Sequence, residues 1–296
     1  MQKIGLALGG GGAKGLAHIP VLEVLDEFGI RPHCIAGTSI GAVIGVLYAS
    51  GYSGREIREG IQQFSFKEGE GLAGLVNRRG DMLKWLDIID LNWRGNGLLK
   101  ADSFLEALMK LTKGSRFDDL KIPLKVVAAD FWKREQVVLD SGDLKPAIRA
   151  SMALPGVFVP EVMGRQVLVD GGAVNPVPFD ILEDCDLVVA VNVMGTRTES
   201  THLVPSMTEA VFNTFQIMQA AILQHKLQTR PPEILISPDI VDIQMLEFYK
   251  AEQVFKQARG ACEELRSKLS SKGFTQVDRP PTATSPPDLA PDTAAR

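Results

Sequence analysis

A serine flanked by glycines lies at the junction of two apolar segments near the start of the chain. Residues 37–41 read Gly-Thr-Ser-Ile-Gly, with apolar residues directly before and after them. A strand followed at once by a helix needs a sharp turn, and G-x-S-x-G at such a turn is typical of a nucleophile elbow, which exposes the oxygen of Ser39. Glycine is favoured at positions 37 and 41 for steric reasons, because the turn is strained and larger side chains would block a substrate. The pattern alone is weak, since Ser39 would equally suit a glycine-rich turn in which it only caps the helix.

The apolar spacing around this turn predicts an α/β fold with a mainly parallel central sheet. A strand, a glycine loop, a helix, a second strand and a second helix follow one another, and this order implies parallel strands with helical connections. In the first part of the chain these elements are residues 3–8, 9–12, 13–28, 34–38 and 40–50. Further strands are predicted at residues 123–130, 135–139, 167–169, 187–193 and 233–237, and further helices at residues 55–64, 102–111, 144–153, 206–228 and 246–269.

The composition is that of an ordinary globular protein with a large core. The chain has 296 residues, of which 45% are hydrophobic and 23% charged. We expect a single domain over residues 1–277. Residues 66–100, which are rich in glycine and tryptophan, fit either a cap-like insertion over the site or plain core helices. The tail at residues 278–296 consists mostly of Pro, Thr, Ser, Ala and Asp, and we expect it to be disordered.

Charge and cysteine content exclude several classes of protein. A net charge of -4 gives no electrostatic ground for nucleic-acid binding. The three cysteines, Cys34, Cys185 and Cys262, lie far apart in the sequence, which indicates free thiols in a reducing compartment. No His or Cys spacing suggests a metal site, and no cofactor is expected. We therefore expect a cytoplasmic protein.

The start of the chain indicates neither a signal peptide nor a membrane span. The first apolar stretch is interrupted by glycines at residues 9–12, too early for the apolar core of a signal peptide. Residues 34–54 carry no charge and are long enough for a membrane span. They are rich in Gly and Ser and centred on Ser39, however, so a buried strand and a closely packed helix explain them better.

A second glycine motif opens the first predicted helix. Backbone amides at a helix N-terminus bind anions, and the amides of Gly10, Gly11 and Gly12 are suited to an oxyanion hole, which stabilises the negative charge that develops on a carbonyl oxygen during acyl transfer. Lys14 adds positive charge close to this loop.

The same glycines match the dinucleotide-binding pattern G-x-G-x-x-G through Gly10, Gly12 and Gly15. That kind of site requires an acidic residue at the end of the second strand, to hold the ribose. The second strand ends instead at Thr38 and Ser39, which argues against a dinucleotide. A phosphate-binding P-loop also fails, because Gly15 stands where Ser or Thr is needed after the lysine.

A nucleophilic serine needs a base, and the sequence offers an aspartate rather than a histidine. His202 lies in a polar loop and His225 within a long predicted helix, so neither is presented to a site. Asp170 ends a short apolar strand and precedes Gly171 and Gly172, which leaves open backbone beside its carboxylate. An ordinary Asp-Gly turn would give the same pattern.

Four motifs in this order make the chain resemble the bacterial patatin-like phospholipases. They are the glycine loop at residues 10–15, the elbow at residues 37–41, the block Ala-Ser-x-Ala-Leu-Pro-Gly-x-Phe-x-Pro at residues 150–160, and Asp170-Gly171-Gly172. The resemblance covers about residues 3–195, roughly two thirds of the chain. Each motif is weak alone, but the four together are specific. Lys14 departs from the family, which often has Arg at this position. Lysine keeps the positive charge but lacks the planar guanidinium group of arginine.

The resemblance implies a patatin-like three-layer α/β/α fold and a Ser–Asp dyad that works without histidine. Ser39 is then the nucleophile and Asp170 its base, in a hydrolase that acts on acyl esters of lipids, of phospholipase A or lysophospholipase type, through an acyl-enzyme. The implied partner is a lipid or acyl-ester substrate, reached by transient contact with a membrane surface. An acyltransferase with the same dyad and a noncatalytic lipid-binding protein remain alternatives. No motif points to a particular oligomeric state.

Overall fold

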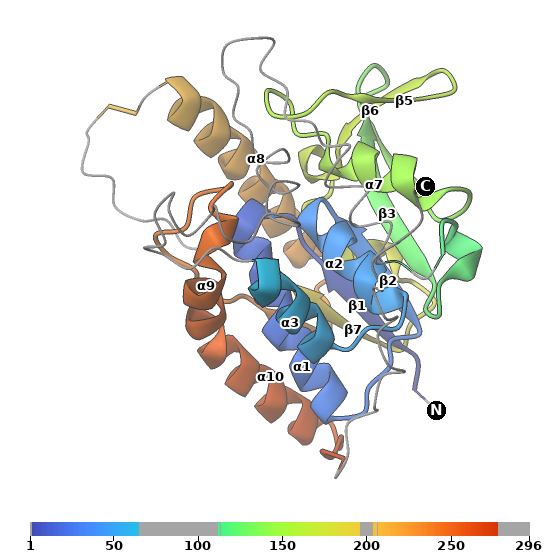
Figure 1. The fold of residues 1–296 in the computed structure, drawn as a ribbon, viewed down its shortest axis with the longest axis vertical. Helices are drawn as coiled ribbons and strands as arrows, with labels where there is room; N and C mark the ends of the chain where they lie inside the picture. The colour runs from blue at the N-terminus through green and yellow to red at the C-terminus, as the bar shows by residue number, and fades with distance from the viewer. Residues whose placement is uncertain (1, 65–111, 113, 196–203, 206, 278–296) are drawn as a thin grey trace, which may run out of the picture.

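The computed structural model describes residues 2–64, 112, 114–195, 204–205 and 207–277. Its core is a sheet with helices on both faces (Figure 1). The strands are β1 (Ile4–Leu8), β2 (Cys34–Thr38), β3 (Leu124–Asp130), β4 (Glu135–Leu139), β5 (Glu161–Met163), β6 (Gln166–Asp170), β7 (Leu187–Val191) and β8 (Ile234–Ile236). The α-helices are α1 (His18–Glu27), α2 (Ile40–Ala49), α3 (Gly54–Phe64), α7 (Leu144–Met152), α8 (Met207–Thr229), α9 (Ala251–Gln257) and α10 (Arg259–Ser271). Short 3₁₀ helices are η1 (Gly12–Ala17), η2 (Phe117–Asp119), η3 (Gly171–Ala173), η4 (Phe179–Ile181) and η5 (Phe248–Lys250).

The sheet is mixed but mainly parallel in its centre, as the sequence predicts. Its strand order is β5-β6-β3-β2-β1-β7-β8, with β4 paired to β3. β1 runs parallel to β2 and β7, β2 parallel to β3, and β7 parallel to β8. β4, β5 and β6 form antiparallel pairs at one side of the sheet. The carboxyl ends of the parallel strands therefore meet at one edge, which is where ligands of open α/β sheets bind.

The alternation of side chains along the central strands builds the three layers. Leu6 and Leu8 of β1 point to the larger core, which they share with α1, α2 and α10. Ala7 points to the opposite face, where the smaller core contains Leu223 of α8. Successive residues of a strand face opposite sides, so a strand that is apolar throughout is buried under helices on both faces.

Three elements differ from the sequence prediction. The helix expected at residues 13–28 begins as the 3₁₀ helix η1, because Gly12 has a φ of 58° and Gly15 lies against the side chain of Ile40. The helix expected at residues 246–269 is broken at Ala258, since α9 packs on η1 and α10 on α1. The strand β5 was not expected, and it exists as the hairpin partner of β6.

Several expectations concern residues outside the described part of the chain. These are the cap-like insertion at residues 66–100, the helix at residues 102–111 and the tail at residues 278–296. The single domain over residues 1–277 thus stays a prediction. Every described helix is too short or too polar to be a transmembrane segment.

Candidate active site

Ser39 occupies a strained turn between β2 and α2. Its φ of 54° and ψ of -123° lie in a region that side-chain-bearing residues rarely adopt. Its side chain makes no hydrogen bond that caps α2, so the interpretation of Ser39 as a simple helix cap is wrong. The strained backbone instead presents a hydroxyl at the carboxyl end of β2, which is the geometry of a nucleophile elbow.

The two glycines of the elbow are required by close packing. A Cβ atom on Gly37 would lie 2.6 Å from the Cα of Ala42, and one on Gly41 would lie 2.8 Å from the Gly9 carbonyl oxygen. Real Cβ contacts are not that short, so any side chain would push α2 away from β1 and the glycine loop. Both glycines therefore allow the close packing that sets the position of Ser39.

The register of β3 brings Asp170 to Ser39. Thr38, which precedes Ser39, pairs with Val127, and Asp170 pairs with the next residue, Ala128. β4 occupies the other edge of β3 over both positions, so β2 and β6 meet end to end along the same edge. As a result Ser39 and Asp170 come together although they are far apart in the sequence, and the Ser39 side chain acts on the pKa of the Asp170 carboxylate.

Asp170 is buried and its carboxylate is held in place. Only 3% of the residue is exposed, and its Oδ1 accepts a hydrogen bond of 2.7 Å from the Gly172 amide. Burial raises the pKa of Asp170 to about 6, while the hydrogen bonds from Ser39 and Gly172 act in the opposite direction. The group is therefore ionised at neutral pH and is a stronger base than an ordinary carboxylate.

Gly171 and Gly172 permit this arrangement. A Cβ on Gly171 would collide with the backbone of β3 at Val127, and one on Gly172 would collide with the side-chain amide of Gln219 in α8. The Asp-Gly-Gly motif thus does more than form a turn. It lets β3 and α8 close directly on the residues that follow Asp170.

Ser151 also belongs to the site, and the sequence reasoning missed its role. The Ser39 amide donates a hydrogen bond of 2.8 Å to the Ser151 hydroxyl oxygen, and Ser151 is fully buried. This contact fixes the peptide that carries the candidate nucleophile. The serine is part of the motif at residues 150–160, which was the available signal, but its partner depends on the packing of α7 on the sheet.

The glycine loop lies beside the nucleophile, with one change to the predicted oxyanion hole. A Cβ on Gly10 would sit 3.5 Å from the Ser39 Cβ, which places the loop next to the elbow. The Gly10 amide already donates to the Pro176 carbonyl oxygen at 2.9 Å. No described residue accepts a hydrogen bond from the amides of Gly11 or Gly12. Two of the three predicted donors are thus available to an oxyanion.

His18 stabilises this loop through a hydrogen bond to its backbone. Its Nε2 lies 2.8 Å from the Gly9 carbonyl oxygen, and the ring is fully buried. Burial lowers the pKa of His18 to about 4, so the ring is neutral and Nε2–H donates to the carbonyl. His33 and His225 are exposed, and His202 lies outside the described residues. The described histidines thus offer no base that faces Ser39.

Lys14 is hydrogen-bonded to the segment that follows β7. Its Nζ donates a hydrogen bond of 2.9 Å to the Met194 carbonyl oxygen, in the segment that follows β7. Burial lowers the pKa of Lys14 from its ordinary value. The contact ties η1 to the end of β7, so the role of Lys14 is structural support of the loop.

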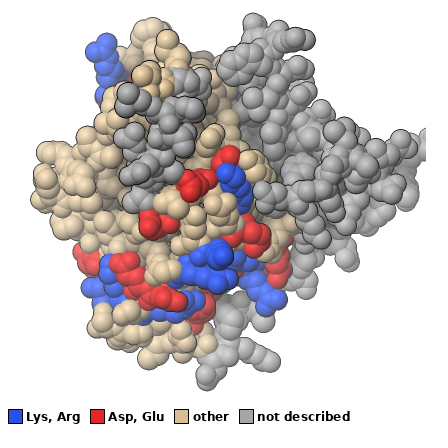
Figure 2. Space-filling view, turned by 90° about the vertical axis from the view of Figure 1, so that its left-hand side faces the viewer, with Lys and Arg blue, Asp and Glu red and all other residues tan. Residues whose placement is uncertain are grey.

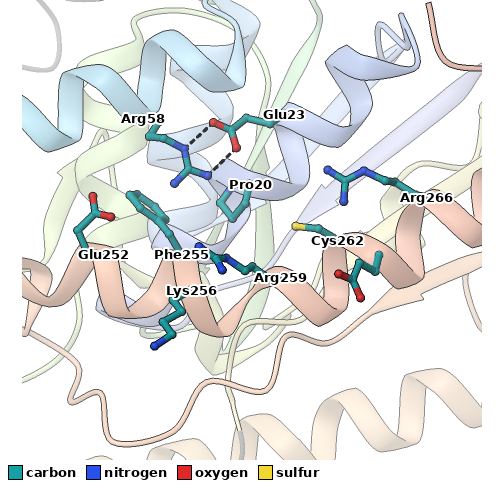
Figure 3. Close-up of a pocket in the computed structure, with 10 residues that line it drawn as sticks. Pro20, Glu23, Arg58, Glu252, Phe255, Lys256, Arg259, Cys262 and Arg266 are labelled. Atoms are coloured by element: carbon teal, nitrogen blue, oxygen red, sulfur yellow. Dashed lines mark hydrogen bonds and ion pairs between the residues drawn. The ribbon is translucent and has the colours of Figure 1, made fainter.

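A pocket of about 530 Å³ lies elsewhere, between α1, α3 and the helices α9 and α10. We call it the charged groove; Glu23, Arg58, Phe255 and Arg259 are among its lining residues (Figure 3). Arg58 binds both carboxylate oxygens of Glu23 and lies over the ring of Phe255, with 4.1 Å between its Cζ and the ring centroid. Basic and acidic side chains intermingle on this face (Figure 2). None of the predicted site residues lines the groove.

Comparison with known proteins identifies the family of the chain. A family model described as patatin-like phospholipase matches residues 6–183. An uncharacterized NTE family protein of Mycobacterium tuberculosis is 33% identical over 197 residues, which are 66% of this chain and 50% of that protein. The lysophospholipase NTE1 of Kluyveromyces lactis is 27% identical over 281 residues, covering 86% of this chain and 18% of that protein.

Among solved structures, VipD from Legionella pneumophila aligns with a TM-score of 0.47 and 14% identity, over 89% of this chain and 67% of VipD. The chain spans about half the length of the mycobacterial relative. The region matched by the family model includes Ser39 and Asp170. By this match, which covers more than half of its length, the chain belongs to the patatin-like phospholipase family.

Proposed function

We propose that this chain hydrolyses acyl esters of lipids, as a phospholipase A or lysophospholipase, with Ser39 as nucleophile and Asp170 as base. The observation that carries the proposal is the strained turn that holds the Ser39 hydroxyl against a buried carboxylate of raised pKa. Strained backbone and shifted pKa values gather at functional sites. The lipid nature of the substrate rests on the family and on the lysophospholipase among the relatives.

The reaction proceeds in two steps. Asp170 accepts the hydroxyl proton while Ser39 attacks the ester carbonyl, and the oxygen that becomes negative is bound by the amides of Gly11 and Gly12. The carbon–oxygen bond to the leaving alcohol then breaks, and Asp170 returns its proton to that alcohol. In the second step Asp170 takes a proton from water, which attacks the carbonyl carbon of the acyl-enzyme. The bond from that carbon to the Ser39 oxygen then breaks, Asp170 returns its proton to that oxygen, and the fatty acid is released.

An ordinary carboxylate is a weak base for a hydroxyl group, and the raised pKa of Asp170 makes this carboxylate a stronger one. An ordinary aspartate has a pKa of about 3.9, against about 6.5 for an imidazole. Burial brings Asp170 to about 6, close to a histidine. Loss of one oxyanion donor typically costs about 3 to 4 kcal/mol of transition-state stabilisation, so Gly11 and Gly12 would supply a large part of the rate.

The proposal is tested by hydrolysis of a lysophospholipid and of a short monomeric ester. Ser39→Ala should abolish both activities, whereas Ser141→Ala, at an exposed loop serine, should keep both. Free fatty acid should be the main product even when a competing alcohol is present. Full activity of Ser39→Ala would refute the nucleophile. Transfer of the acyl group to the alcohol in place of water would identify an acyltransferase, and a wild-type chain inactive on every ester would favour a noncatalytic lipid-binding protein.

A further inference from the structure

Exposed apolar side chains gather at the edge of the sheet that carries Ser39. Phe131 and Trp132 follow β3, the exposed residues of α8 follow β7, and Leu246 follows β8. β2, β3, β7 and β8 run parallel through the pairing with β1, so the segments after them share one edge with Ser39, which follows β2. Exposed apolar side chains mark an interaction site where they adjoin one another, and those of α8 lie on a single helix.

The C-terminal half of α8 is anchored to the body of the protein. Gln219 is buried and its side-chain amide lies against Gly172, whose amide holds Asp170. Leu223 packs into the smaller core, and Lys226 forms an ion pair with Asp180. These contacts fix the position and rotation of the helix, and they place its middle directly beside the candidate dyad.

The N-terminal half of α8 extends away from the sheet (Figure 1), and several of its apolar side chains are exposed to solvent. Met207 is 82% exposed, Val211 56% and Met218 52%. At about 100° per residue these three positions fall within about 40° of one another around the helix, so they form one stripe. Met218 is next in sequence to Gln219, and the stripe therefore runs up to the site itself.

The charge pattern of α8 favours a hydrocarbon surface as its partner. Residues 210–225 contain no Asp, Glu, Lys or Arg. An acidic or basic partner would find no complementary charge on this stretch, and a surface that attracts acidic headgroups would carry basic residues. Exposed apolar side chains with no charge among them can enter the boundary between headgroups and acyl chains without moving a charge out of water.

We propose that α8 docks on a lipid bilayer through the stripe of Met207, Val211 and Met218, with the sheet edge of Ser39 turned toward the same surface. The inference rests on the proposed function, because a lipid hydrolase must bring its nucleophile to the membrane that holds its substrate. The continuity of the stripe with Gln219 and Gly172 places the docking surface at the mouth of the candidate site. Substrate leaving the bilayer would then reach Ser39 without crossing water.

The test compares vesicle binding with hydrolysis of a water-soluble ester. A triple variant, Met207→Gln, Val211→Gln and Met218→Gln, keeps good helix-forming residues and alters only exposed positions. Its matched control is Val277→Gln. Val277 is an exposed apolar residue beside the C-terminal end of α1, and its backbone amide donates a hydrogen bond to the Glu27 carbonyl oxygen. Circular dichroism confirms that both variants are folded.

We expect the wild-type chain and Val277→Gln to bind phosphatidylcholine vesicles with little dependence on salt. The triple variant should lose on the order of 100-fold in vesicle partitioning and lose hydrolysis of vesicle lipid, yet cleave the soluble ester at the wild-type rate. Unchanged vesicle binding by the triple variant would overturn the proposal. So would a wild-type dimer that this variant converts to monomers, because the stripe would then face a second copy. A chain that binds vesicles but cleaves no ester would refute the proposed function and leave the docking surface standing.

Discussion

Two regions differ in whether their charged side chains have ionic partners: the charged groove, and the edge of the sheet that carries Ser39. In the groove Arg58 binds Glu23 through two hydrogen bonds, and nearby Arg266 binds Glu27 in the same way. At the sheet edge Ser39 has a positive φ, and Asp170 is a buried carboxylate whose neighbours among the described residues, Ser39 and the Gly172 amide, are neutral. The groove is a pocket of about 530 Å³, but the strained backbone of Ser39 and the buried carboxylate of Asp170 lie at the sheet edge.

The difference teaches that concavity alone does not identify an active site. Arg58 and Arg266 in the groove are each held by a carboxylate, and a ligand that sought either guanidinium would first have to displace that partner. At the sheet edge the carboxylate and the amides of Gly11 and Gly12 have capacity left for a reacting group. Variants in each of the two regions test this difference.

The largest effect is expected from Asp170→Asn, which removes the base and keeps the shape. We expect kcat on a soluble ester to fall by about 10³-fold, since general bases contribute roughly 10² to 10⁴. In the groove, Glu23→Gln should change kcat less than about twofold. Asp130→Asn is the control at the sheet edge, because Asp130 ends the neighbouring strand β3 and caps its turn. An equal loss in Asp130→Asn would mean that the effect is structural.

The pH dependence of the reaction should follow the same carboxylate. Because Asp170 must be ionised to accept a proton, kcat/KM should be constant above its pKa of about 6 and fall about tenfold per pH unit below it. Steady-state rates of the wild-type chain on a soluble ester from pH 4.5 to pH 8.5 measure this. A profile that stays flat down to pH 4.5 would exclude Asp170 as the base.

The stability of the protein should show the cost of keeping Asp170 ionised and buried. The pKa is raised from 3.8 to about 6 in the folded chain, so the folded state holds the proton more tightly than the unfolded state. The free energy of unfolding therefore decreases as the pH rises from about 4 to about 6, by up to about 3 kcal/mol from this group. Asp170→Asn should remove that decrease and be more stable than the wild type at pH 8. Urea unfolding of both proteins at pH 4.5 and pH 8 tests the sign, and parallel pH curves would contradict it.

A smaller effect is expected from Ser151→Ala. The variant loses the acceptor of the Ser39 amide, which should loosen the elbow without removing a reacting group. We expect about a tenfold lower kcat with KM nearly unchanged, and a loss of stability of about 1 kcal/mol. Ser151→Thr should restore part of the rate if its hydroxyl reaches the amide. A change in KM alone would show that Ser151 acts on substrate binding.

The smallest effect is expected from Arg259→Gln in the groove. Arg259 makes no ion pair with any described residue, so the change should leave kcat/KM within about twofold and stability within about 0.5 kcal/mol. Ester hydrolysis and thermal unfolding measure both quantities. A tenfold loss of kcat/KM would connect the groove to catalysis and break the contrast between the two regions.

Much of the fold follows from local sequence patterns. The central strands are predicted correctly from apolar runs such as residues 34–38 and 187–193, because burial on both faces requires continuous apolar residues. Glycines beside these runs correctly predict the loops at the carboxyl ends of the strands. The three residues of β5 carry no such pattern, and they form a strand only because β6 pairs with them. The break at Ala258 likewise depends on the direction of α1 and η1, which the sequence of α9 and α10 does not encode.

The candidate dyad was predicted from motifs, whereas its supports were not. Ser39 and Asp170 stand beside glycines, and glycine marks close approach of the backbone. Ser151, His18 and Gln219 act through single tertiary contacts with the Ser39 amide, the Gly9 carbonyl and Gly172. Such contacts depend on strand register and helix rotation, and no local spacing reveals them. The pairing of Gly10 with Pro176 is of the same kind.

The most direct test of the account is covalent labelling with a fluorophosphonate, followed by mass analysis of the labelled peptide. We predict one adduct per chain, on Ser39, formed at a rate that rises with pH through about 6 in the wild type. In Asp170→Asn the rate should be about 10³-fold lower, while Glu23→Gln labels as fast as the wild type. An adduct on another residue, or equal labelling of Asp170→Asn, would contradict the Ser39–Asp170 dyad.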